Sequence, residues 1–368
     1  MKNILFLEQF SFLGGGQKVL LKLIKGLDYR SWVIIPGEGD FSRALTGIGA
    51  QPIVAPIGQY STGRKSLIDF VKYLFLSIIM VFFSIYIIKK NQINIVYANA
   101  PRTFLWGALA AKICGIPVIW HLHSNLKGVE LRLSRFLAKH WVDKLIAVSN
   151  FTSNVFNNGD PILLAKTSVV YNGIDPREYD QVAVSDLHKT YNLQGKKVIT
   201  FIGRITPLKG IKTLIEAADI IKNEGQLAYL IVGEPAPGDR KDVEYRGKLV
   251  DFVGKHKLTD RVLFVGQRND IPSILKMTDI LVLPSVEPEA CPLVILEAIA
   301  AGKNVITTDI GGQAELAKEG LLFPPGDAQK LADLIILGIN TKVGRESGAV
   351  ETRTSFQQKI AETIASLI

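Results

Sequence analysis

Cysteine is scarce in this chain. Its 368 residues contain only Cys114 and Cys291, which are too few for a disulfide framework or for a zinc site with four ligands. A reducing, cytoplasmic location fits this composition. The first residues, MKNILFLEQFSFLGGGQ, lack the long apolar run and small-residue cleavage site of a signal peptide. We therefore expect no secretory leader.

The glycine pattern of dinucleotide-binding turns, G-x-G-x-x-G, is also missing. This absence does not favour a nicotinamide-dependent oxidoreductase on a Rossmann scaffold, although Glu38 is available as a ribose-binding acid. The sequence shows no internal repeat and no low-complexity tract. Repeat architectures and disordered chains are therefore not expected.

The residues that are present describe a basic globular protein. Hydrophobic residues make up 48% of the chain and charged residues 21%, with a formal net charge of +9. Such a composition supplies ample core. The positive charge favours a polyanionic partner, which leaves nucleotide phosphates, nucleic acid and an anionic membrane surface open.

One uncharged segment, YLFLSIIMVFFSIYII at residues 73–88, has three interpretations. Lys72 precedes it, and Lys89 and Lys90 follow. It is slightly short of the roughly 20 apolar residues that cross a bilayer. A buried helix of an α/β domain is the first interpretation, and a helix lying on an anionic membrane surface is the second. A true span is the least favoured, because strand-like INIVYAN follows closely.

Short Ile- and Val-rich runs alternate with helical stretches along the whole chain, which is typical of parallel sheets covered on both faces. The sequence therefore predicts two doubly wound Rossmann-like α/β domains facing a deep cleft, with ligands at the carboxyl ends of the strands. The expected domain boundary lies within polar residues 175–196, and residues 340–350 form another weak region. The strands expected are NILFLE, SWVIIP, INIVYA, PVIWHLH and DKLIAVS in the first half, and KVITFIGR, LAYLIVG, RVLFVG, DILVLP and NVITTD in the second.

Two candidate sites follow strands in the first half. Gly14, Gly15 and Gly16 come after the first strand, before a helix expected to open near Gln17. Such a turn lets a ligand approach the backbone and the free N–H groups of the helix, although it is as often only a tight turn. In HLHSN, an extended strand would place His121 and His123 on one side. A metal pair would need a third ligand, so hydrogen bonding, acid–base chemistry or a structural role remain open.

Two more candidates follow strands in the second half. In FIGRITPLKG, Arg204 and Lys209 lie at a strand-to-helix crossing, where they can converge on a diphosphate or remain solvated surface cations. In PEACPLVILEAIAAG, Glu289 precedes a helix that we expect to begin at Pro292. Glu297 follows in its second turn among apolar residues. Sugar hydroxyls would suit both acids, while a structural salt bridge is the alternative for Glu297.

Together these stretches resemble the retaining GT-B glycosyltransferases of family 4, in order and over nearly the full chain. The motifs that carry the resemblance are GGGQKVLLKLIKGL, VIWHLHS, IAVSN, VVYNGID, FIGRITPLKG, VLFVGQRNDI and PEACPLVILEAIAAGKNVITTDIGGQAEL. The pair of acids separated by seven residues is the most specific of these. The resemblance implies an N-terminal acceptor-side domain, residues 1–175, onto which a C-terminal helix, 352–368, packs back. It implies a donor-binding domain at residues 176–351.

The resemblance also implies roles for particular residues. Glu289 would contact the donor sugar, Glu297 the ribose, and His123 the reacting sugar, while Arg204 and Lys209 would hold the diphosphate. The other donor-binding residues it implies are Gly15, Gly16, Gly203, Gln267, Arg268, Pro292, Leu293 and Val294. One departure stands out: Ala290, Cys291 and Pro292 replace the usual glycine-bearing triplet, and proline has no N–H to donate.

The expected activity is transfer of a hexose from a nucleotide-diphosphate sugar with retention of configuration, with UDP-glucose the first candidate and other UDP-hexoses or a GDP-sugar next. The acceptor would be a glycan or lipid-linked molecule in bacterial polysaccharide or glycolipid assembly. No D-x-D occurs, so no metal or other cofactor is expected, and no nucleic-acid partner. A non-catalytic membrane-surface protein that keeps the fold is the remaining alternative.

Overall fold

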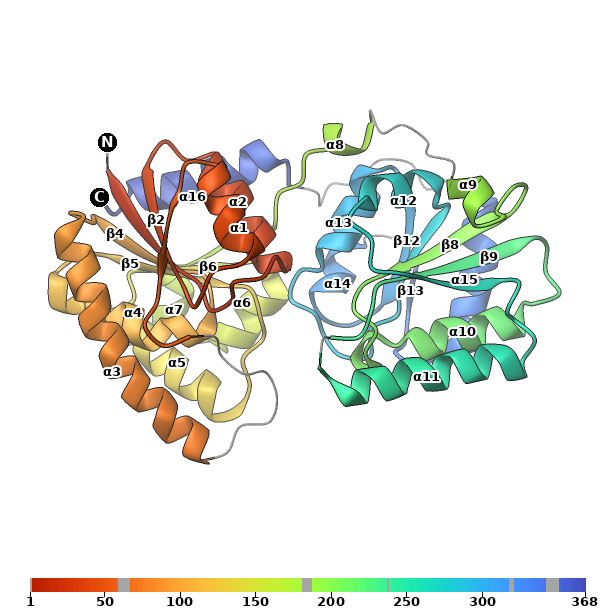
Figure 1. Cartoon of the computed structure of the whole chain (residues 1–368), viewed down its shortest axis with the longest axis horizontal. Coiled ribbons are helices and arrows are strands. Elements are labelled where there is room, and N and C mark those ends of the chain that lie inside the picture. Colours follow the sequence, from red (N-terminus) through yellow and green to blue (C-terminus); the bar gives the residue numbers. More distant parts are fainter. Residues whose placement is uncertain (1, 59–66, 181–186, 237, 318–320, 342–350) are drawn as a thin grey trace. The chain divides into compact units, whose positions relative to one another are not determined.

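The computed structural model describes residues 2–58, 67–180, 187–236, 238–317, 321–341 and 351–368. The chain forms two compact units, coloured along the sequence in Figure 1. Unit 1 comprises Met1–Gly173 and Arg353–Ile368, and unit 2 comprises Ile174–Thr352. The sequence places these boundaries at 175/176 and 351/352. Residues 181–186 of the expected linker and 342–350 of the expected weak region lie outside the described residues.

Unit 1 is built on a parallel sheet with the strand order β3-β2-β1-β4-β5-β6-β7. Figure 1 shows α1, α2 and α16 on one face of this sheet and α3, α4 and α5 on the other. Its strands are β1 (Asn3–Leu7), β2 (Arg30–Ile35), β3 (Gln51–Val54), β4 (Ile95–Ala98), β5 (Val118–Leu122), β6 (Lys144–Ala147) and β7 (Thr167–Val169). Its helices are α1 (Gly15–Lys25), α2 (Asp40–Gly47), α3 (Leu67–Lys90), α4 (Pro101–Cys114), α5 (Gly128–Trp141), α6 (Asn150–Asn157), α7 (Pro161–Lys166) and α16 (Arg353–Ala365).

Unit 2 repeats this plan with the parallel order β10-β9-β8-β11-β12-β13. Its strands are β8 (Lys197–Ile202), β9 (Leu227–Val232), β10 (Val262–Gly266), β11 (Ile280–Leu283), β12 (Asn304–Thr308) and β13 (Leu322–Phe323). Its helices are α8 (Arg177–Asp180), α9 (Leu187–Thr190), a 3-10 turn (Pro207–Lys209), α10 (Ile211–Ile220), α11 (Arg240–Lys255), α12 (Ile271–Met277), α13 (Leu293–Ala300), α14 (Gly311–Leu316) and α15 (Ala328–Asn340).

The two doubly wound sheets confirm the predicted fold class. The central strands β1, β4, β5, β8, β9 and β11 are almost entirely buried, as expected for strands covered on both faces. The sequence predicts neither β3 nor β7. β3 contains Pro52 and is only partly buried, and β7 is three residues long, so neither has the apolar run of a central strand.

The strand order reverses once in each sheet, between β1 and β4 in unit 1 and between β8 and β11 in unit 2. Connections leave the sheet in opposite directions at such a point. In open α/β sheets ligands bind outside the carboxyl ends of the two strands at such a point, so a ligand is expected at one strand pair in each unit.

Helix α3 contains the uncharged segment 73–88, and its two faces differ. One face is buried: Tyr73 donates a hydrogen bond from its hydroxyl to the carbonyl of Arg102 at 3.1 Å, and Met80 and Ile88 enter the core. The other face is apolar and exposed, with side chains Leu74, Phe75, Ile78, Ile79, Phe82 and Tyr86. Lys72–Lys90 is long and apolar enough to cross a membrane by length and composition, and a third of it is buried.

The C-terminal helix α16 returns to unit 1 and packs beside α1. Phe356, Ile360 and Ile364 are fully buried, and the Gln357 amide donates to the carbonyl of Lys22 at 2.6 Å. Thr352, just before α16, forms a parallel bridge with Ile174. The two segments that connect the units are therefore hydrogen-bonded to each other.

Candidate functional site

In unit 2 the candidate residues gather where the strand order reverses. Arg204 and Lys209 follow β8, and the loop that carries Glu289 follows the neighbouring strand β11. The two segments are joined by their backbones, because Val286 N–H donates to the carbonyl of Leu208 at 2.9 Å. The fold thus brings together residues that lie about eighty positions apart.

Gly210 makes this close approach possible. It ends the 3-10 turn in the left-handed region, at φ +63°. A Cβ atom there would lie 1.9 Å from the carbonyl oxygen of Pro284. Only glycine fits, both for conformation and for space. Lys209 and Gly210 therefore act together: the glycine lets the backbone pass close enough for Lys209 to contact the loop after β11.

Lys209 and Glu289 form an ion pair, with 2.6 Å between Nζ and Oε2. Their side chains are 22% and 21% exposed, so the pair is mostly buried but still reached by solvent. The Ser285 hydroxyl donates to the other carboxylate oxygen of Glu289. A lysine ammonium has three donors, and Glu289 takes one of them, which leaves donors for an anionic ligand.

Helix α14 holds Glu289 from the other side. Gln313 is fully buried, and its Oε1 accepts from the backbone N–H of Glu289 at 2.8 Å. Gly312 N–H donates to the carbonyl of Glu289 at 2.8 Å. These bonds fix the backbone of the loop, while Lys209 and Ser285 hold the carboxylate of Glu289. Ser285 and Gln313 were not among the predicted site residues. The only signal for them in the sequence is that each follows a strand, Ser285 after β11 and Gln313 after β12.

Arg204 has a different environment. It lies directly after Gly203, its side chain is exposed, and it has no hydrogen-bond or ion-pair partner in the described part of the chain. Gly203 itself is held to β9, because its N–H donates to the carbonyl of Val232 at 2.9 Å. The backbone at this strand end is therefore fixed while the guanidinium keeps all its donors for a ligand.

Glu297 lies in the second turn of α13, as predicted, and is half-buried. It hydrogen-bonds to the hydroxyl of Tyr179, whose pKa is raised above its ordinary value by burial and by the Glu297 charge. A tyrosine is thus one hydrogen-bond partner of this acid.

Helix α13 begins one residue later than expected. Pro292 is its N-cap and Leu293 its first residue. The N–H of Ile295 bonds to the carbonyl of Pro292, so Leu293 and Val294 supply the free amide N–H groups of this helix end. The proline therefore removes a donor from the position before the helix and leaves the first-turn donors in place.

Gln267 and Arg268 lie farther along the same sheet. They follow β10, the edge strand, which β9 separates from β8. Gln267 is exposed. Arg268 makes a bidentate ion pair with Asp270, with N–O distances of 2.9 and 2.8 Å. Its guanidinium is already engaged, in contrast to that of Arg204.

In unit 1 the glycine-rich stretch forms the start of α1. The helix begins at Gly15, with Gly14 as its N-cap, two residues earlier than expected. Gly15 and Gly16 therefore belong to the first turn itself. A Cβ at Gly16 would meet nothing within 4 Å, so this turn offers its backbone to open space.

The two predicted histidines lie together at the end of β5, with ring centroids 3.8 Å apart. His121 is buried, and its Nδ1 lies 2.7 Å from the Tyr97 hydroxyl. His123 Nε2 lies 2.9 Å from Oδ1 of Asn99, at the end of β4. Burial lowers the pKa of His123 to about 4, so it is neutral at physiological pH. No group of three or more metal-binding side chains occurs among the described residues.

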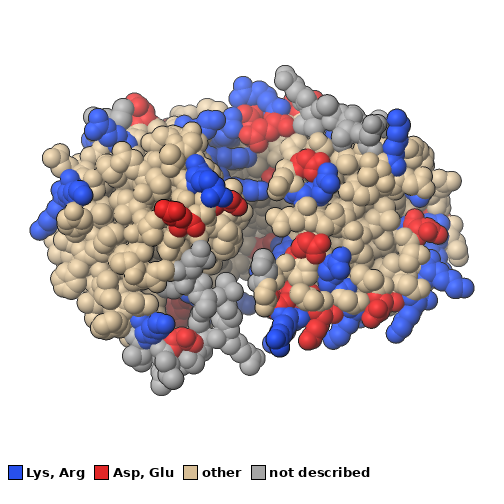
Figure 2. All heavy atoms as spheres, in the orientation of Figure 1, with Lys and Arg blue, Asp and Glu red and all other residues tan. Residues whose placement is uncertain are grey.

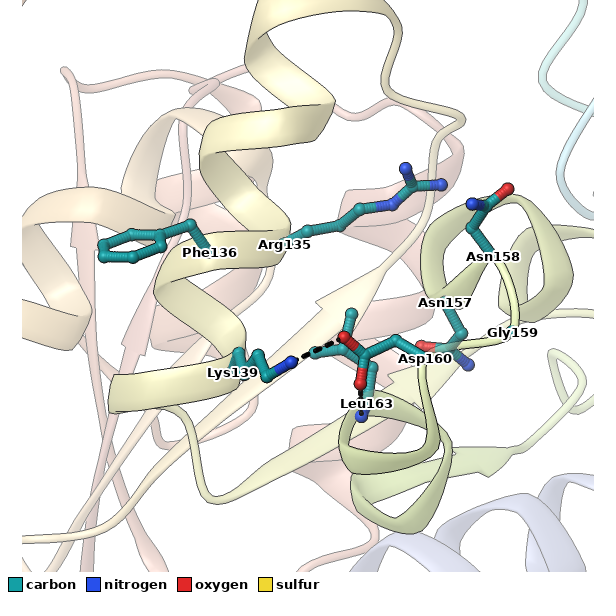
Figure 3. Close-up of a pocket in the computed structure, with 8 residues that line it drawn as sticks. All are labelled: Arg135, Phe136, Lys139, Asn157, Asn158, Gly159, Asp160 and Leu163. Carbon is teal, nitrogen blue, oxygen red and sulfur yellow. Dashed lines mark hydrogen bonds and ion pairs between the residues drawn. The ribbon is translucent and has the colours of Figure 1, made fainter.

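A separate hollow of unit 1 lies among α5, α6 and α7 (Figure 3). Its charged groups serve the fold. Arg135 donates to the carbonyls of Val155 and Phe156 at the end of α6, at 2.6 Å each. Lys139 pairs with Asp160 at 2.9 Å, and Asp160 caps α7. In Figure 3, Phe136 points away from these groups. We therefore assign no ligand to this hollow.

Charge is distributed differently over the two units. Figure 2 shows Lys and Arg mixed with Asp and Glu along α11 of unit 2, whose sequence is RKDVEYRGKLVDFVGK. The surface of unit 1 over α3 carries few charged side chains in the same view. The first is a solvated face of mixed sign, and the second is an apolar face.

Two doubly wound sheets with candidate side chains at their reversal points have the architecture of the two-domain GT-B glycosyltransferases. Two family models place the chain among them. Residues 13–178 match the model described as Glycosyltransferase Family 4, and residues 185–361 match Glycosyl transferases group 1. The chain belongs to the GT-B glycosyltransferases, which confirms the resemblance seen in its motifs and goes against an oxidoreductase.

Relatives support the same assignment. The chain is 29% identical over 276 residues to the UDP-Gal:alpha-D-GlcNAc-diphosphoundecaprenol alpha-1,3-galactosyltransferase of Escherichia coli, covering 70% of this chain and 69% of the relative. It is 26% identical over 344 residues to the N,N'-diacetylbacillosaminyl-diphospho-undecaprenol alpha-1,3-N-acetylgalactosaminyltransferase of Campylobacter jejuni, covering 86% and 84%. Among solved structures, Anabaena Alr3699/HepE in complex with UDP and glucose matches with a TM-score of 0.84 at 26% identity, covering 100% of both chains.

Proposed function

We propose that this protein transfers a hexose from a UDP-sugar, UDP-glucose being the first candidate, with retention of configuration. The observation that carries this proposal is the Lys209–Glu289 pair at the reversal point of unit 2, where a lysine and an acid meet beside the free amide N–H groups of α13. The complexes of HepE with UDP, with UDP and glucose and with UDP-glucose support the choice of donor.

Each part of unit 2 has a task in this proposal. Arg204 and Lys209 hold the diphosphate, since Arg204 has unused donors and Lys209 retains two. Glu289 accepts hydrogen bonds from hydroxyls of the donor sugar. Glu297 accepts from the ribose, beside Tyr179. The first-turn amides of Leu293 and Val294 add positive potential at the same helix end.

The chemical requirement is stabilisation of the departing diphosphate, which carries the charge that develops in the transition state. Preorganised cations and amide dipoles stabilise such charge without reorganising. We propose that this machinery works without a metal ion or other cofactor, with Gly15, Gly16 and His123 of unit 1 as further contacts of the substrates. Gly203, Gln267 and Arg268 complete the proposed donor-binding residues.

The proposed acceptor is a glycan or a lipid-linked sugar of bacterial polysaccharide or glycolipid assembly. The names of the E. coli and C. jejuni relatives refer to diphosphoundecaprenol-linked substrates. The exposed apolar face of α3, flanked by exposed Lys72, Lys89 and Lys90, suits peripheral contact with an anionic membrane. We propose that the enzyme works at the inner face of the cell membrane.

Donor binding and transfer test the proposal directly. A thermal-shift and calorimetric panel of UDP- and GDP-sugars should show binding of a UDP-hexose. Transfer to diphosphoundecaprenol-linked acceptors should persist in EDTA and give a product whose anomeric NMR signal keeps the donor configuration. Arg204→Ala should reduce kcat/KM about 100-fold, the range found when one transition-state donor is removed. Glu297→Ala should also reduce kcat/KM, because the ribose loses a hydrogen-bond acceptor.

The matched control is Arg240→Ala, since Arg240 is an exposed arginine at the start of α11. It should transfer at the wild-type rate. Wild-type turnover in the Arg204 or Glu297 variant would contradict the assigned roles. Absence of any nucleotide affinity in the wild type would instead favour a non-catalytic protein.

A further inference from the structure

Unit 1 contains a buried acid that the proposed chemistry does not use. Glu8 follows β1 directly and is 3% exposed. A carboxylate buried in this way is costly unless it is hydrogen-bonded, and burial raises the pKa of Glu8. It accepts from Asn99 Nδ2 at 2.7 Å and from the backbone N–H of Gln9 at 2.7 Å. The side chain of Gln17 is a further hydrogen-bond partner.

These bonds tie Glu8 to both candidate features of unit 1. Asn99 contacts His123, and Gln17 contacts the glycine-rich start of α1, because its Oε1 accepts from Gly14 N–H at 3.1 Å. The strands involved are neighbours in the sheet, in the order β1, β4, β5. One carboxylate therefore sits between the histidine and the helix start, and each is reached through a single amide side chain.

The carboxylate also decides which way each amide points. Glu8 accepts one N–H on each carboxyl oxygen, from the backbone of Gln9 and from the NH₂ group of Asn99, which is the pattern of a carboxylate that only accepts hydrogen bonds. The Asn99 oxygen then faces His123 Nε2, and because that oxygen can only accept, Nε2 must carry the proton. By the same argument, Gln17 turns its NH₂ group to Glu8 and its oxygen to Gly14. Reversing either amide would set two donors or two acceptors against each other.

His123 is left with a defined hydrogen-bonding pattern. With Nε2 protonated and the ring neutral, Nδ1 carries the lone pair. Nδ1 has no partner among the residues that the structure describes. The neighbouring ring of His121, 3.8 Å away between centroids, restricts rotation of the imidazole. The group offered to a ligand is therefore a single acceptor.

We propose that Glu8 is a positioning residue: through Asn99 it holds His123 as the Nε2–H tautomer with Nδ1 ready to accept a hydrogen bond from a substrate hydroxyl, and through Gln17 it fixes the start of α1. The inference rests on the proposed sugar transfer for its effect on rate. The tautomer itself does not depend on that function, since it follows from the contacts inside unit 1.

Glu8→Gln tests this assignment, because the new side chain has nearly the same shape but can also donate. Either orientation of Asn99 then finds a partner, so His123 should become a mixture of tautomers. In protein labelled with ¹⁵N-histidine, the His123 ring of the wild type should show a protonated Nε2 and an unprotonated Nδ1. In Glu8→Gln a second population with protonated Nδ1 should appear. His123→Gln assigns the signal.

The rate of transfer gives the second readout. Loss of an orienting partner should lower kcat about 10- to 100-fold, by analogy with groups that orient metal ligands. The KM for the donor should change less than kcat, because the proposed donor contacts of unit 2 are untouched. Glu130→Gln, at an exposed glutamate in the first turn of α5, is the control and should behave as the wild type.

An unchanged Nε2–H tautomer or an unchanged kcat in Glu8→Gln would overturn the proposal. If Glu8→Gln does not fold, Asn99→Ser carries the same test, since it removes the amide that sets the tautomer and retains Glu8. A wild-type protein with the expected tautomer but no transferase activity would refute the proposed function and leave the orienting role of Glu8 in place.

Discussion

At the scale of single residues, the charged groups of the candidate site depend on neighbours that carry no charge. Lys209 reaches Glu289 because Gly210 lets one backbone pass close to another. Glu289 keeps its orientation because Ser285 and Gln313 bond to it. Substituting these supports should therefore disturb the site as much as substituting the ions.

Gly210→Ala should destabilise unit 2 strongly. The left-handed backbone at φ +63° strains any residue with a Cβ, and this Cβ would collide with the carbonyl of Pro284. We expect a loss on the order of 3 kcal/mol, the sum of conformational strain and of a backbone shift. Urea unfolding followed by far-UV circular dichroism measures it.

Gly225→Ala separates the two causes. Gly225 also has a positive φ, +48°, but a Cβ there would meet nothing within 4 Å. This variant should lose only about 1 kcal/mol, the strain alone. Equal losses in the two variants would show that steric contact with Pro284 contributes nothing.

The sequence singles out the charged residues of the candidate site more readily than the residues that support them. Arg204, Lys209 and Glu289 each come soon after an apolar strand, within a recognisable pattern. Glu8, Asn99 and Gln313 also follow strands, but their roles depend on which strands are neighbours. Because β1 adjoins β4 and β8 adjoins β11 through long crossovers, that information is not local in the sequence.

At the scale of elements, one face of α3 is that of the buried helix expected from its sequence, and the other face is the one that membrane contact would use. One face is buried against α4 and the core, as in an ordinary α/β layer, and the other presents apolar side chains outward. A run that is apolar all round has no period from which to choose a buried face. The sequence alone therefore could not divide the helix into its two faces.

Membrane contact through α3 should be lost when the exposed face is made polar. Phe75→Ser with Phe82→Ser changes side chains that are 64% and 69% exposed, so stability should change little. Binding to vesicles containing phosphatidylglycerol should weaken roughly 10- to 100-fold, because each phenylalanine contributes about 1 kcal/mol or more of apolar transfer. Co-sedimentation measures the partition.

Leu337→Ser provides the control, since Leu337 is 52% exposed on α15 of unit 2. Binding should remain at the wild-type level in this variant, and should fall with added salt because lysines contribute. Vesicle binding that is the same for the double variant and the wild type would remove α3 as the contact surface.

At the scale of the whole molecule, the buried groups of unit 1 make its stability depend on pH. The pKa of His123 is lowered to about 4, and that of His121 is also lowered, in both cases chiefly by burial. In the unfolded chain both titrate near 6.5. The contribution of the two neutral histidines to the stability of unit 1 is complete above pH 6.5 and is lost as the pH falls from 6.5 towards 4.

Glu8 acts in the opposite direction, because its pKa is raised and the folded state binds its proton first. Its contribution to stability grows as the pH falls through its folded pKa towards 4.5. With two histidines against one glutamate, we expect the free energy of unfolding of unit 1 to fall below pH 6.5. The slope for each histidine is at most about 1.4 kcal/mol per pH unit.

Tryptophan fluorescence isolates this effect, since all four tryptophans, Trp32, Trp106, Trp120 and Trp141, belong to unit 1. Urea unfolding at several pH values between 7.5 and 5 should give a declining stability. His123→Gln should make the decline shallower, and His140→Gln, at an exposed position in α5, should not. The same slope in His123→Gln and the wild type would contradict the prediction.

The return of α16 to unit 1 has a consequence for the order of synthesis. Unit 1 is interrupted in the chain by the whole of Ile174–Thr352, so a ribosome makes all of unit 2 before it makes the helix that covers α1. At about 5–20 residues per second, that delay is on the order of ten to forty seconds. During it, the nascent N-terminal unit waits with the pocket for Phe356, Ile360 and Ile364 unfilled. Unit 1 is therefore translated first and completed last. During this delay, chaperones would find apolar surface exposed on unit 1.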